Sequence, residues 1–186
     1  MSPFRPDLVD VWIFRRADGP GREEVGGAVG GGPEAVGGDP EPGLQILLMR
    51  RSPGRILPGL WQCVSGSLEA GESVTDGALR ELREETGFGP AEVEAFFDLD
   101  QVNQFHEPSF RAIVTSAIFA VRVGVAAEPV LSHEHDAMRW ASVDEAMELA
   151  IWPAYRESIR RIAENLLDPD RSIWFELTLD GERARR

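Results

Sequence analysis

Residues 66–88 read GSLEAGESVTDGALRELREETGF, and this stretch carries the strongest helix signal in the chain. Ser73 is followed three residues later by Asp76, an arrangement that resembles a capping box at a helix start. Gly87 is the residue type that commonly ends a helix. The pattern therefore predicts a helix over residues 73–86.

Two glutamates of this helix fall on its apolar side. With residues about 100° apart, the core-facing stripe and the exposed face separate cleanly; the stripe holds Val74, Ala78, Leu79 and Leu82, and the exposed face holds Asp76, Arg80, Arg83 and Glu84. Glu81 and Glu85 lie against the stripe, one turn apart, with carboxylates about 6 Å from each other. Their repulsion is about 3 kcal/mol at an effective dielectric constant near 20. A divalent cation would satisfy both carboxylates; a solvated helix laced with Glu–Arg pairs is the alternative.

The spacing of residues along the whole stretch is specific. It reads Gly66, five residues, Glu72, seven residues, then Arg80-Glu81-Leu82, one residue, Glu84-Glu85, one residue, and Gly87-Phe88. This pattern resembles the signature of the Nudix hydrolases at every position. The resemblance implies an α/β fold in which helices sandwich a mixed central β-sheet. It also implies hydrolysis of a diphosphate linked to another moiety, with Mg²⁺ or Mn²⁺ as cofactor.

The same resemblance implies roles for individual residues. Glu81 and Glu85 match the family's metal ligands, and Glu84 matches a further ligand or the catalytic base. Glu72 and Arg80 match an internal ion pair that fixes the loop against the helix. The catalytic set that the resemblance implies has four members: Glu72, Arg80, Glu81 and Glu84. The carbonyl of Gly66 is expected to face a metal.

Other residues resemble one branch of the family, the dihydroneopterin triphosphate and deoxynucleoside triphosphate pyrophosphohydrolases. The resemblance rests on three segments: Trp61-Gln62, residues 64–69 (VSGSLE), and Glu134-His135 ahead of Trp140. In that branch a glutamate at the position of Glu134 completes the metal site.

Four residues are candidates for substrate binding. The branch implies substrate contacts by Arg50 and Ser65, and a guanidinium suits phosphate oxygens because it donates two parallel hydrogen bonds. Trp61 and Phe105 could stack on a base or pterin ring. The alternatives stay open: a surface arginine at a strand end, and aromatic residues of the core.

The function implied is cleavage of a nucleoside or pterin triphosphate to the monophosphate and pyrophosphate. A Nudix-fold module that senses a nucleotide without turnover is an alternative of another class. A third possibility is a structural domain whose helix is merely acidic. The intact set of glutamates favours the enzyme, since a sensor does not need all of them.

Composition excludes several classes of function. The chain has 186 residues, a formal net charge of −13, one cysteine and no lysine, so lysine Schiff bases, pyridoxal phosphate and lysine-dependent phosphate loops are excluded. The acidic balance opposes binding to nucleic acid or an anionic membrane. Cys63 cannot form an intrachain disulfide or a thiolate zinc site. We expect a small nucleotide as the partner and a cytoplasmic location, and a homodimer is compatible with the sequence.

The chain as a whole is predicted to be one domain, residues 1–186, with a flexible insertion at residues 17–43. More than half of the glycines fall in that stretch, which has almost no large apolar side chain; a glycine-rich phosphate loop is the alternative reading. Beta-like or helical patterns outside it predict strands at Leu8–Phe14, Leu44–Met49, Leu60–Val64, Glu94–Val102, Ala112–Val123, before Ser142 and at Ile173–Leu179, and helices after Ser142 and from Pro153 to about Leu167.

Overall fold

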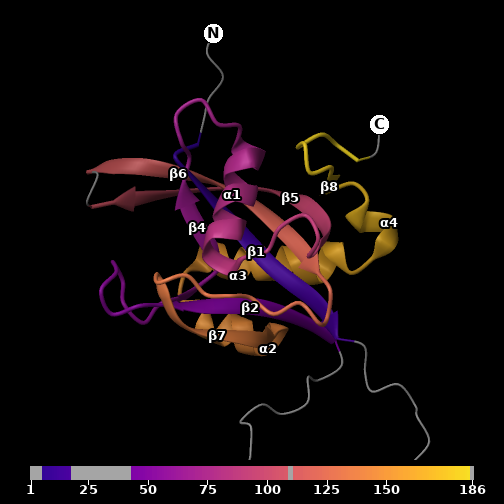
Figure 1. Cartoon of the computed structure of the whole chain (residues 1–186), viewed down its shortest axis with the longest axis horizontal. Coiled ribbons are helices and arrows are strands. Elements are labelled where there is room, and N and C mark those ends of the chain that lie inside the picture. Colours follow the sequence, from indigo (N-terminus) through magenta and orange to yellow (C-terminus); the bar gives the residue numbers. More distant parts are fainter. Residues whose placement is uncertain (1–5, 18–42, 109–110, 185–186) are drawn as a thin grey trace, which may run out of the picture.

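The computed structural model of the protein describes residues 6–17, 43–108 and 111–184. Its elements follow one another in chain order (Figure 1): β1 (Leu8–Ala17), β2 (Gly43–Arg51), β3 (Trp61–Gln62), β4 (Val64–Ser67), α1 (Val74–Thr86), β5 (Val93–Glu107), β6 (Ala112–Val123), β7 (His135–Ser142), α2 (Val143–Leu149), α3 (Pro153–Arg161), a π-helical segment η1 (Ile162–Leu166), α4 (Pro169–Ser172) and β8 (Glu176–Leu177).

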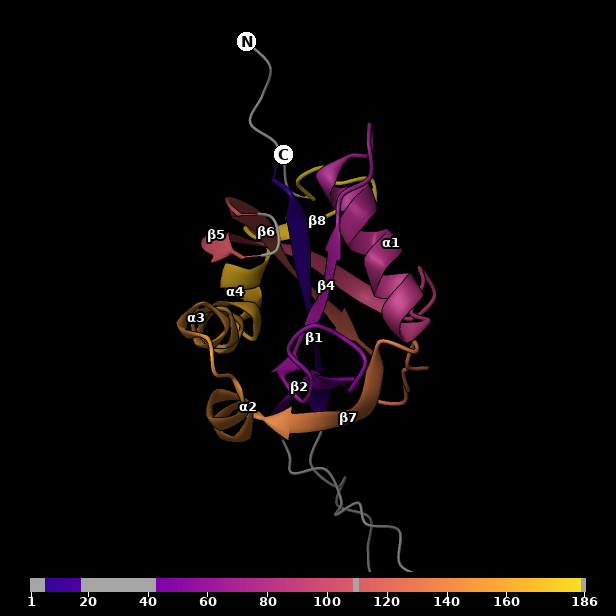
Figure 2. The same ribbon diagram turned by 90° about the vertical axis from the view of Figure 1, so that its left-hand side faces the viewer.

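The strands form a mixed sheet centred on β1. The order along the sheet is β3-β2-β1-β6-β5-β8, with β4 also paired to β1 and β7 to β2. β1 and β6 run parallel, whereas β1 pairs antiparallel with β2 and β4. Figure 2 shows α1 on one side of the sheet and α2, α3 and α4 on the other. The predicted α/β/α sandwich with a mixed central sheet is confirmed.

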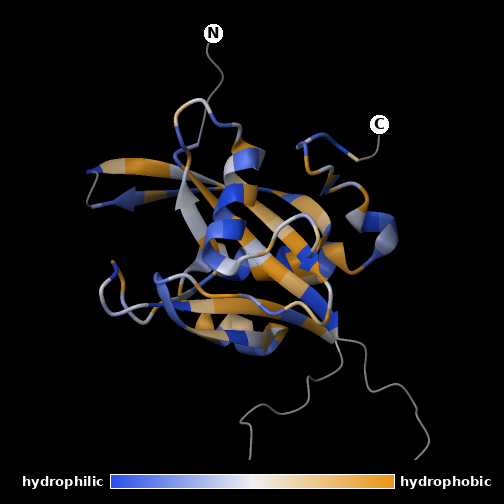
Figure 3. Ribbon diagram, in the orientation of Figure 1, coloured by the Kyte–Doolittle hydropathy of each residue, from blue (hydrophilic) through white to orange (hydrophobic). Residues whose placement is uncertain are grey.

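Alternation along β1 explains the two layers. Successive side chains of a strand point to opposite faces. Val9, Val11 and Ile13 join the core beneath α1, and Trp12 and Phe14 join the core beneath α2 and α3. Both faces are apolar, which is why the strand colours of Figure 3 are mostly hydrophobic while the outer side of α1 is hydrophilic. β1 is therefore buried on both sides and fixes where each helix packs.

Three predicted elements have the wrong bounds. The strand predicted at Leu60–Val64 is two strands, because β3 pairs with β2 whereas β4 crosses to pair with β1. The strand predicted to end at Val102 continues to Glu107, since its far half pairs with β6. The strand predicted at Ile173–Leu179 is reduced to the two residues of β8, which lie at the edge of the sheet against β5.

The predicted insertion lies almost wholly outside the described residues. Its two ends, Ala17 and Gly43, pair with each other across β1 and β2, so the chain leaves and returns at one point of the sheet. β1 and β2, on either side of the insertion, are therefore neighbours in the sheet. None of the helices that the structure describes has the length and apolar character needed to cross a bilayer.

Candidate active site

The ends of α1 are fixed by the residues that the sequence singles out. The Ser73 hydroxyl accepts a hydrogen bond from the Asp76 N–H at 3.1 Å. Gly87 adopts a left-handed conformation, with φ of 74°, and its N–H donates to the carbonyl of Arg83. Such caps satisfy backbone groups that the helix leaves free. The caps therefore fix the position of α1, and with it the positions of its acidic residues along β4.

Glu81 lies against the backbone of β4. A Cβ atom at Gly66 would lie only 1.8 Å from Cδ of Glu81, so no other residue type leaves room for this carboxylate. Burial is the main cause that raises the pKa of Glu81, and its ion pair with Arg80 opposes the shift. The glycine of the motif is thus a close-approach glycine that admits an acidic side chain.

Glu85 is the most deeply buried acid of the site. It is 4% exposed, and its pKa is raised to about 8, first by burial and then by the carboxylates of Glu81 and Glu134; a backbone hydrogen bond from Ser65 opposes the shift. Within the described part of the chain, its Oε2 atom has no hydrogen-bond partner. The two glutamates that helix periodicity turns inward are inward in the structure.

Arg80 is not on the exposed face where helix periodicity puts it. Its side chain is 17% exposed, because the long side chain bends back over the loop. Its Nε and Nη2 atoms donate to both oxygens of Glu72, at 2.9 and 3.1 Å, and Nη2 also donates to the Ser67 carbonyl at 2.9 Å. Its Nη1 atom lies 2.8 Å from Glu81. The expected Glu72–Arg80 pair is present, and it ties the loop to both the helix and β4.

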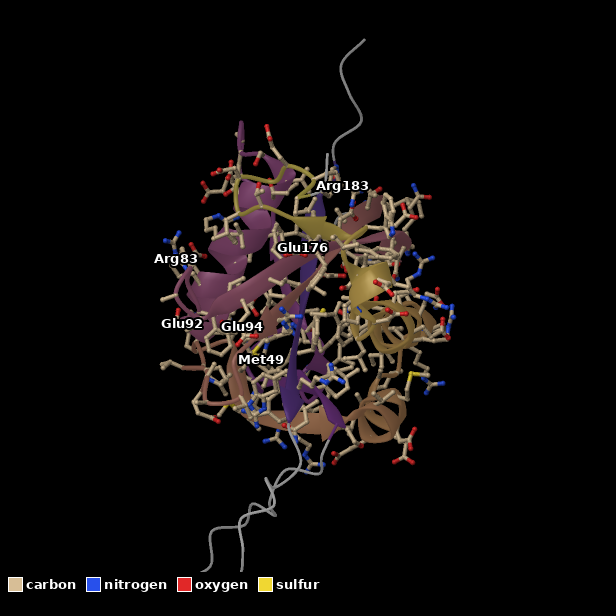
Figure 4. The ribbon with its side chains drawn as sticks, turned by 90° about the vertical axis from the view of Figure 1, so that its right-hand side faces the viewer. Met49, Arg83, Glu92, Glu94, Glu176 and Arg183 are labelled. Carbon is tan, nitrogen blue, oxygen red and sulfur yellow. The ribbon has the colours of Figure 1, made fainter. Side chains whose placement is uncertain are left out.

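Arg83 shows the contrast. It is exposed, and Figure 4 shows its side chain on the outer side of α1, pointing away from the sheet. Two arginines three residues apart thus face different surroundings. Of these two arginines, Arg80 is the one paired with acidic side chains of the site.

Glu84 and Glu134 lie at the open side of the site. Glu84 is 58% exposed and lies 3.4 Å from Nη1 of Arg80. Glu134, in the turn before β7, pairs with Arg55 at 3.2 Å. Among the described residues, no three His, Cys, Asp or Glu side chains are already arranged to enclose a metal ion. Glu81 and Glu84 are paired with Arg80, and Glu134 is paired with Arg55.

The residues nevertheless fit a divalent cation with a preference for oxygen ligands. The Glu85 oxygen without a partner and the raised pKa values of Glu81 and Glu85 mark a buried acidic cluster whose negative charge the nearby arginines offset only in part. Glu134 is close enough to raise both pKa values although it is remote in sequence. Carboxylates and a backbone carbonyl are the ligands that such cations take, so these three glutamates, Glu84 and the Gly66 carbonyl could hold one.

Of the four predicted substrate residues, two lie together and two lie apart. Arg50 and Trp61 are paired across β2 and β3, and the guanidinium carbon lies 5.9 Å from the indole centroid. Arg50 also donates to Asp136 at 2.7 Å. Ser65 lies on β4 opposite Asp10 of β1, and its hydroxyl lowers the pKa of that buried carboxyl. Phe105 stands apart, 42% exposed on β5, so the structure brings only Arg50 and Trp61 together.

A cavity of about 380 Å³ lies beside α1. Glu81, Glu85 and Glu134 do not line it, so it does not coincide with the candidate metal site. Its wall is largely apolar and consists of Glu72, Asp76, Leu79, Arg80, Leu82, Arg83, Phe88, Gly89, Pro90, Val93 and Leu179.

Sequence reasoning missed two features of the site. Asp10 is 4% exposed, and burial raises its pKa to about 6 while the hydroxyls of Ser65 and Ser116 oppose the shift. Its signal was present, since it is the one charged residue in the apolar run of residues 8–14. His135 is named by the branch resemblance beside Glu134, but its position 3.8 Å from Glu85, with its side chain fully buried, depends on strand pairing that the sequence does not show.

Comparison with known proteins identifies the family. The model of the NUDIX domain matches residues 35–162. Over 122 residues the chain is 40% identical to an octanoyltransferase of Myxococcus xanthus; the match covers 64% of this chain and 32% of that protein, so the chain spans about a third of this relative. Over 110 residues it is 33% identical to the CTP pyrophosphohydrolase of Escherichia coli (strain K12), covering 59% of this chain and 76% of that protein.

Solved structures agree on the fold. A NUDIX hydrolase of Listeria monocytogenes superposes with a TM-score of 0.66 at 22% identity, covering 89% of this chain and 97% of that one. The dihydroneopterin triphosphate pyrophosphohydrolase of E. coli gives a TM-score of 0.55 at 19% identity, covering 83% and 97%. With the complete motif and the matching domain model, the chain belongs to the Nudix family.

Proposed function

We propose that this Nudix protein is a hydrolase that cleaves a nucleoside or pterin triphosphate to the monophosphate and pyrophosphate, with Mg²⁺ or Mn²⁺. The observation that carries the proposal is the buried Glu85 carboxyl with further carboxylates around it. The CTP pyrophosphohydrolase, which is 33% identical over the matched region, supports a nucleoside triphosphate as substrate. A divalent cation would offset the charge of the substrate's phosphates, which otherwise repels an attacking water.

The residues of the chain would divide the work. Glu81, Glu85 and Glu134 would hold the cation, and the exposed Glu84 is free enough of the core to take the proton of the attacking water. Arg80 fixes the loop through Glu72 and keeps these carboxylates in place. In the hydrolysis, the water oxygen bonds to phosphorus, the bridging P–O bond breaks, and pyrophosphate leaves.

Arg50 and Trp61 would receive the remainder of the substrate. The guanidinium is 42% exposed and can exchange its contact with Asp136 for a phosphate oxygen. The half-buried Trp61 presents a ring next to it that can stack on a base or pterin. Ser65 and Phe105 remain predicted substrate contacts. The homodimer and the cytoplasmic location also remain predictions.

A substrate panel tests the proposal. The protein is incubated with Mg²⁺ or Mn²⁺ and each ribo- and deoxynucleoside triphosphate or dihydroneopterin triphosphate, and pyrophosphate and phosphate are measured separately. Reaction in ¹⁸O-labelled water should place the label in the monophosphate if the α-phosphorus is attacked. Release of phosphate alone would contradict the proposed cleavage. Binding of a nucleotide with no turnover of any substrate would favour the sensing module.

A further inference from the structure

Three side chains form a line behind the buried metal-site glutamate. Nη1 of Arg51 lies 3.4 Å from Oε1 of Gln62, and Nε2 of Gln62 lies 3.4 Å from Nε2 of His135. Nδ1 of His135 lies 3.8 Å from Oε2 of Glu85. We call Arg51, Gln62 and His135 together the Arg51–Gln62–His135 chain. It joins β2, β3 and β7 to the helix that carries the motif.

Strand pairing places all three residues on the α1 side of the sheet. Gln62 lies opposite Met49, whose side chain packs in the core beneath α1. Arg51 is two residues beyond Met49, so it faces the same side. A register shift between Arg50 and Arg51 then sets Arg51 opposite His135. Irregularities of this kind re-aim side chains next to functional sites, and here the shift completes the line.

The hydrogen bonds of the chain can run in only one direction. A guanidinium donates and never accepts, so Gln62 must accept through Oε1 and present its amide NH₂ to His135. Nε2 of His135 then has to accept, which leaves the ring proton on Nδ1. That proton is directed at Glu85. One charged donor at the far end thus fixes the tautomer of a ring that is otherwise free to adopt either form.

The two atoms that face each other at the Glu85 end of this chain are available to pair. Nδ1 of His135 and Oε2 of Glu85 are both buried, and neither has a hydrogen-bond partner within the described residues. A buried donor and a buried acceptor that face each other at 3.8 Å need only a small side-chain rotation to pair. Elsewhere in proteins, such partners orient metal-binding carboxylates, and their loss lowers metal affinity ten- to hundredfold.

We propose that His135 is a positioning residue: as the Nδ1–H tautomer set by Arg51 and Gln62, it holds the Glu85 carboxylate in the orientation that binds the divalent cation. This inference rests on the metal site of the proposed function. It assigns a purpose to a buried polar line that the Nudix motif itself does not include. A ring that merely fills space in the core would need neither a fixed tautomer nor a donor.

Two measurements on the full chain test the proposal. Long-range ¹H–¹⁵N NMR of the metal-free protein should show His135 as the Nδ1–H tautomer. Mn²⁺ binding by calorimetry should weaken ten- to hundredfold in His135→Leu, which has no donor. His135→Asn, whose amide nitrogen stands near the position of Nδ1, should bind within a few-fold of the wild type. His106→Leu, at an exposed histidine of β5, is the matched control and should bind as the wild type does.

Each outcome separates this inference from the proposed function. An Nε2–H tautomer, or equal Mn²⁺ affinity in His135→Leu and wild type, overturns the positioning role and leaves the metal site standing. Weakening that is the same in His135→Asn and His135→Leu, with unfolding midpoints equal to that of the wild type, also overturns it. Absence of Mn²⁺ binding in the wild type overturns the metal site and, with it, the role of His135.

Discussion

Among the described residues, each face of the sheet buries one carboxyl almost completely, and the neighbours of the two carboxyls differ. On the α1 face, Glu85 has the carboxylates of Glu81 and Glu134 as neighbours, and its pKa is raised to about 8. On the opposite face, Asp10 has the hydroxyls of Ser65 and Ser116, and its pKa is raised only to about 6. Burial is the largest cause at both sites.

The neighbours explain the difference. Hydroxyl groups donate hydrogen bonds to an ionised carboxylate and so favour its charge, whereas a second carboxylate repels it. The two hydroxyls near Asp10 therefore favour its charged form. Glu85 can be ionised at neutral pH at low cost only if a cation joins the cluster. A buried acid thus indicates a metal site when its neighbours are also acids, and burial alone does not.

The largest expected effect is on catalysis at the α1 face. Glu85→Gln removes a charge from the metal site with little change of shape, so turnover should fall at least about a hundredfold while the fold is kept. Initial rates with saturating Mg²⁺, together with circular dichroism, check this. Glu148→Gln, at an exposed glutamate of α2, is the control and should keep full activity. Activity within a few-fold of wild type in Glu85→Gln would show that its role is misassigned.

A smaller effect is expected at the glycine that admits Glu81. In Gly66→Ala the new methyl group collides with the Glu81 carboxylate, the movable end of a flexible side chain. The side chain should swing away, so turnover should fall about tenfold or more while the free energy of unfolding changes by about 1 kcal/mol or less. Urea unfolding and initial rates measure both. Gly54→Ala, where a Cβ meets nothing within 4 Å, should change neither.

The pH dependence of stability should separate the two faces. A carboxyl whose folded pKa is raised above its unfolded value contributes stability at low pH and loses it as pH rises through the folded pKa. For Asp10 this loss falls between about pH 4 and 6, and for Glu85 it extends to about pH 8. Urea unfolding of the metal-free protein across this range should show both losses.

Variants assign each loss to its face. Asp10→Asn should flatten the pH profile only below about pH 6, whereas Glu85→Gln should reduce its slope from about pH 4.5 to about pH 8 and abolish the loss above pH 6. Added Mg²⁺ should offset the loss due to Glu85 and leave the loss due to Asp10. A wild-type profile that is flat from pH 4 to 9 would contradict both raised pKa values.

The smallest effect is expected at the helix start, away from the carboxylates. Ser73→Ala removes the hydroxyl that caps α1, and the free energy of unfolding should fall by about 1 kcal/mol. Turnover should stay within about twofold, because α1 remains packed along its length. Thermal unfolding and initial rates test this, with Ser142→Ala at the equivalent cap of α2 as the matched variant. A large loss of turnover in Ser73→Ala alone would show that the cap positions the acids.

Local patterns in the sequence predict what depends on neighbours along the chain. The inward direction of Glu81 and Glu85 follows from helix periodicity, and the caps at Ser73 and Gly87 follow from residue type. The bend of Arg80 does not, because it depends on where Glu72 and the Ser67 carbonyl come to rest. Long side chains reach across a helix face to such partners, so periodicity alone places them on the wrong side.

Contacts across strands are beyond such patterns. The branch resemblance picks out Glu134, yet nothing in the sequence shows that His135 returns to Glu85 or that Gln62 lies between it and Arg51. Those contacts depend on the register of β7 against β2 and on its shift near Arg51. The split of β3 from β4 has the same origin, since adjacent residues pair with different strands. Register is a property of the folded sheet, and short patterns leave it open.

Calorimetric titration with Mn²⁺ at pH 8, on the wild type, Glu85→Gln and Asp10→Asn, tests the central claim most directly. The account predicts saturable binding to the wild type, affinity at least about tenfold weaker in Glu85→Gln, and wild-type affinity in Asp10→Asn. Equal binding by all three proteins, or binding lost only in Asp10→Asn, would contradict the assignment of the metal to the α1 face.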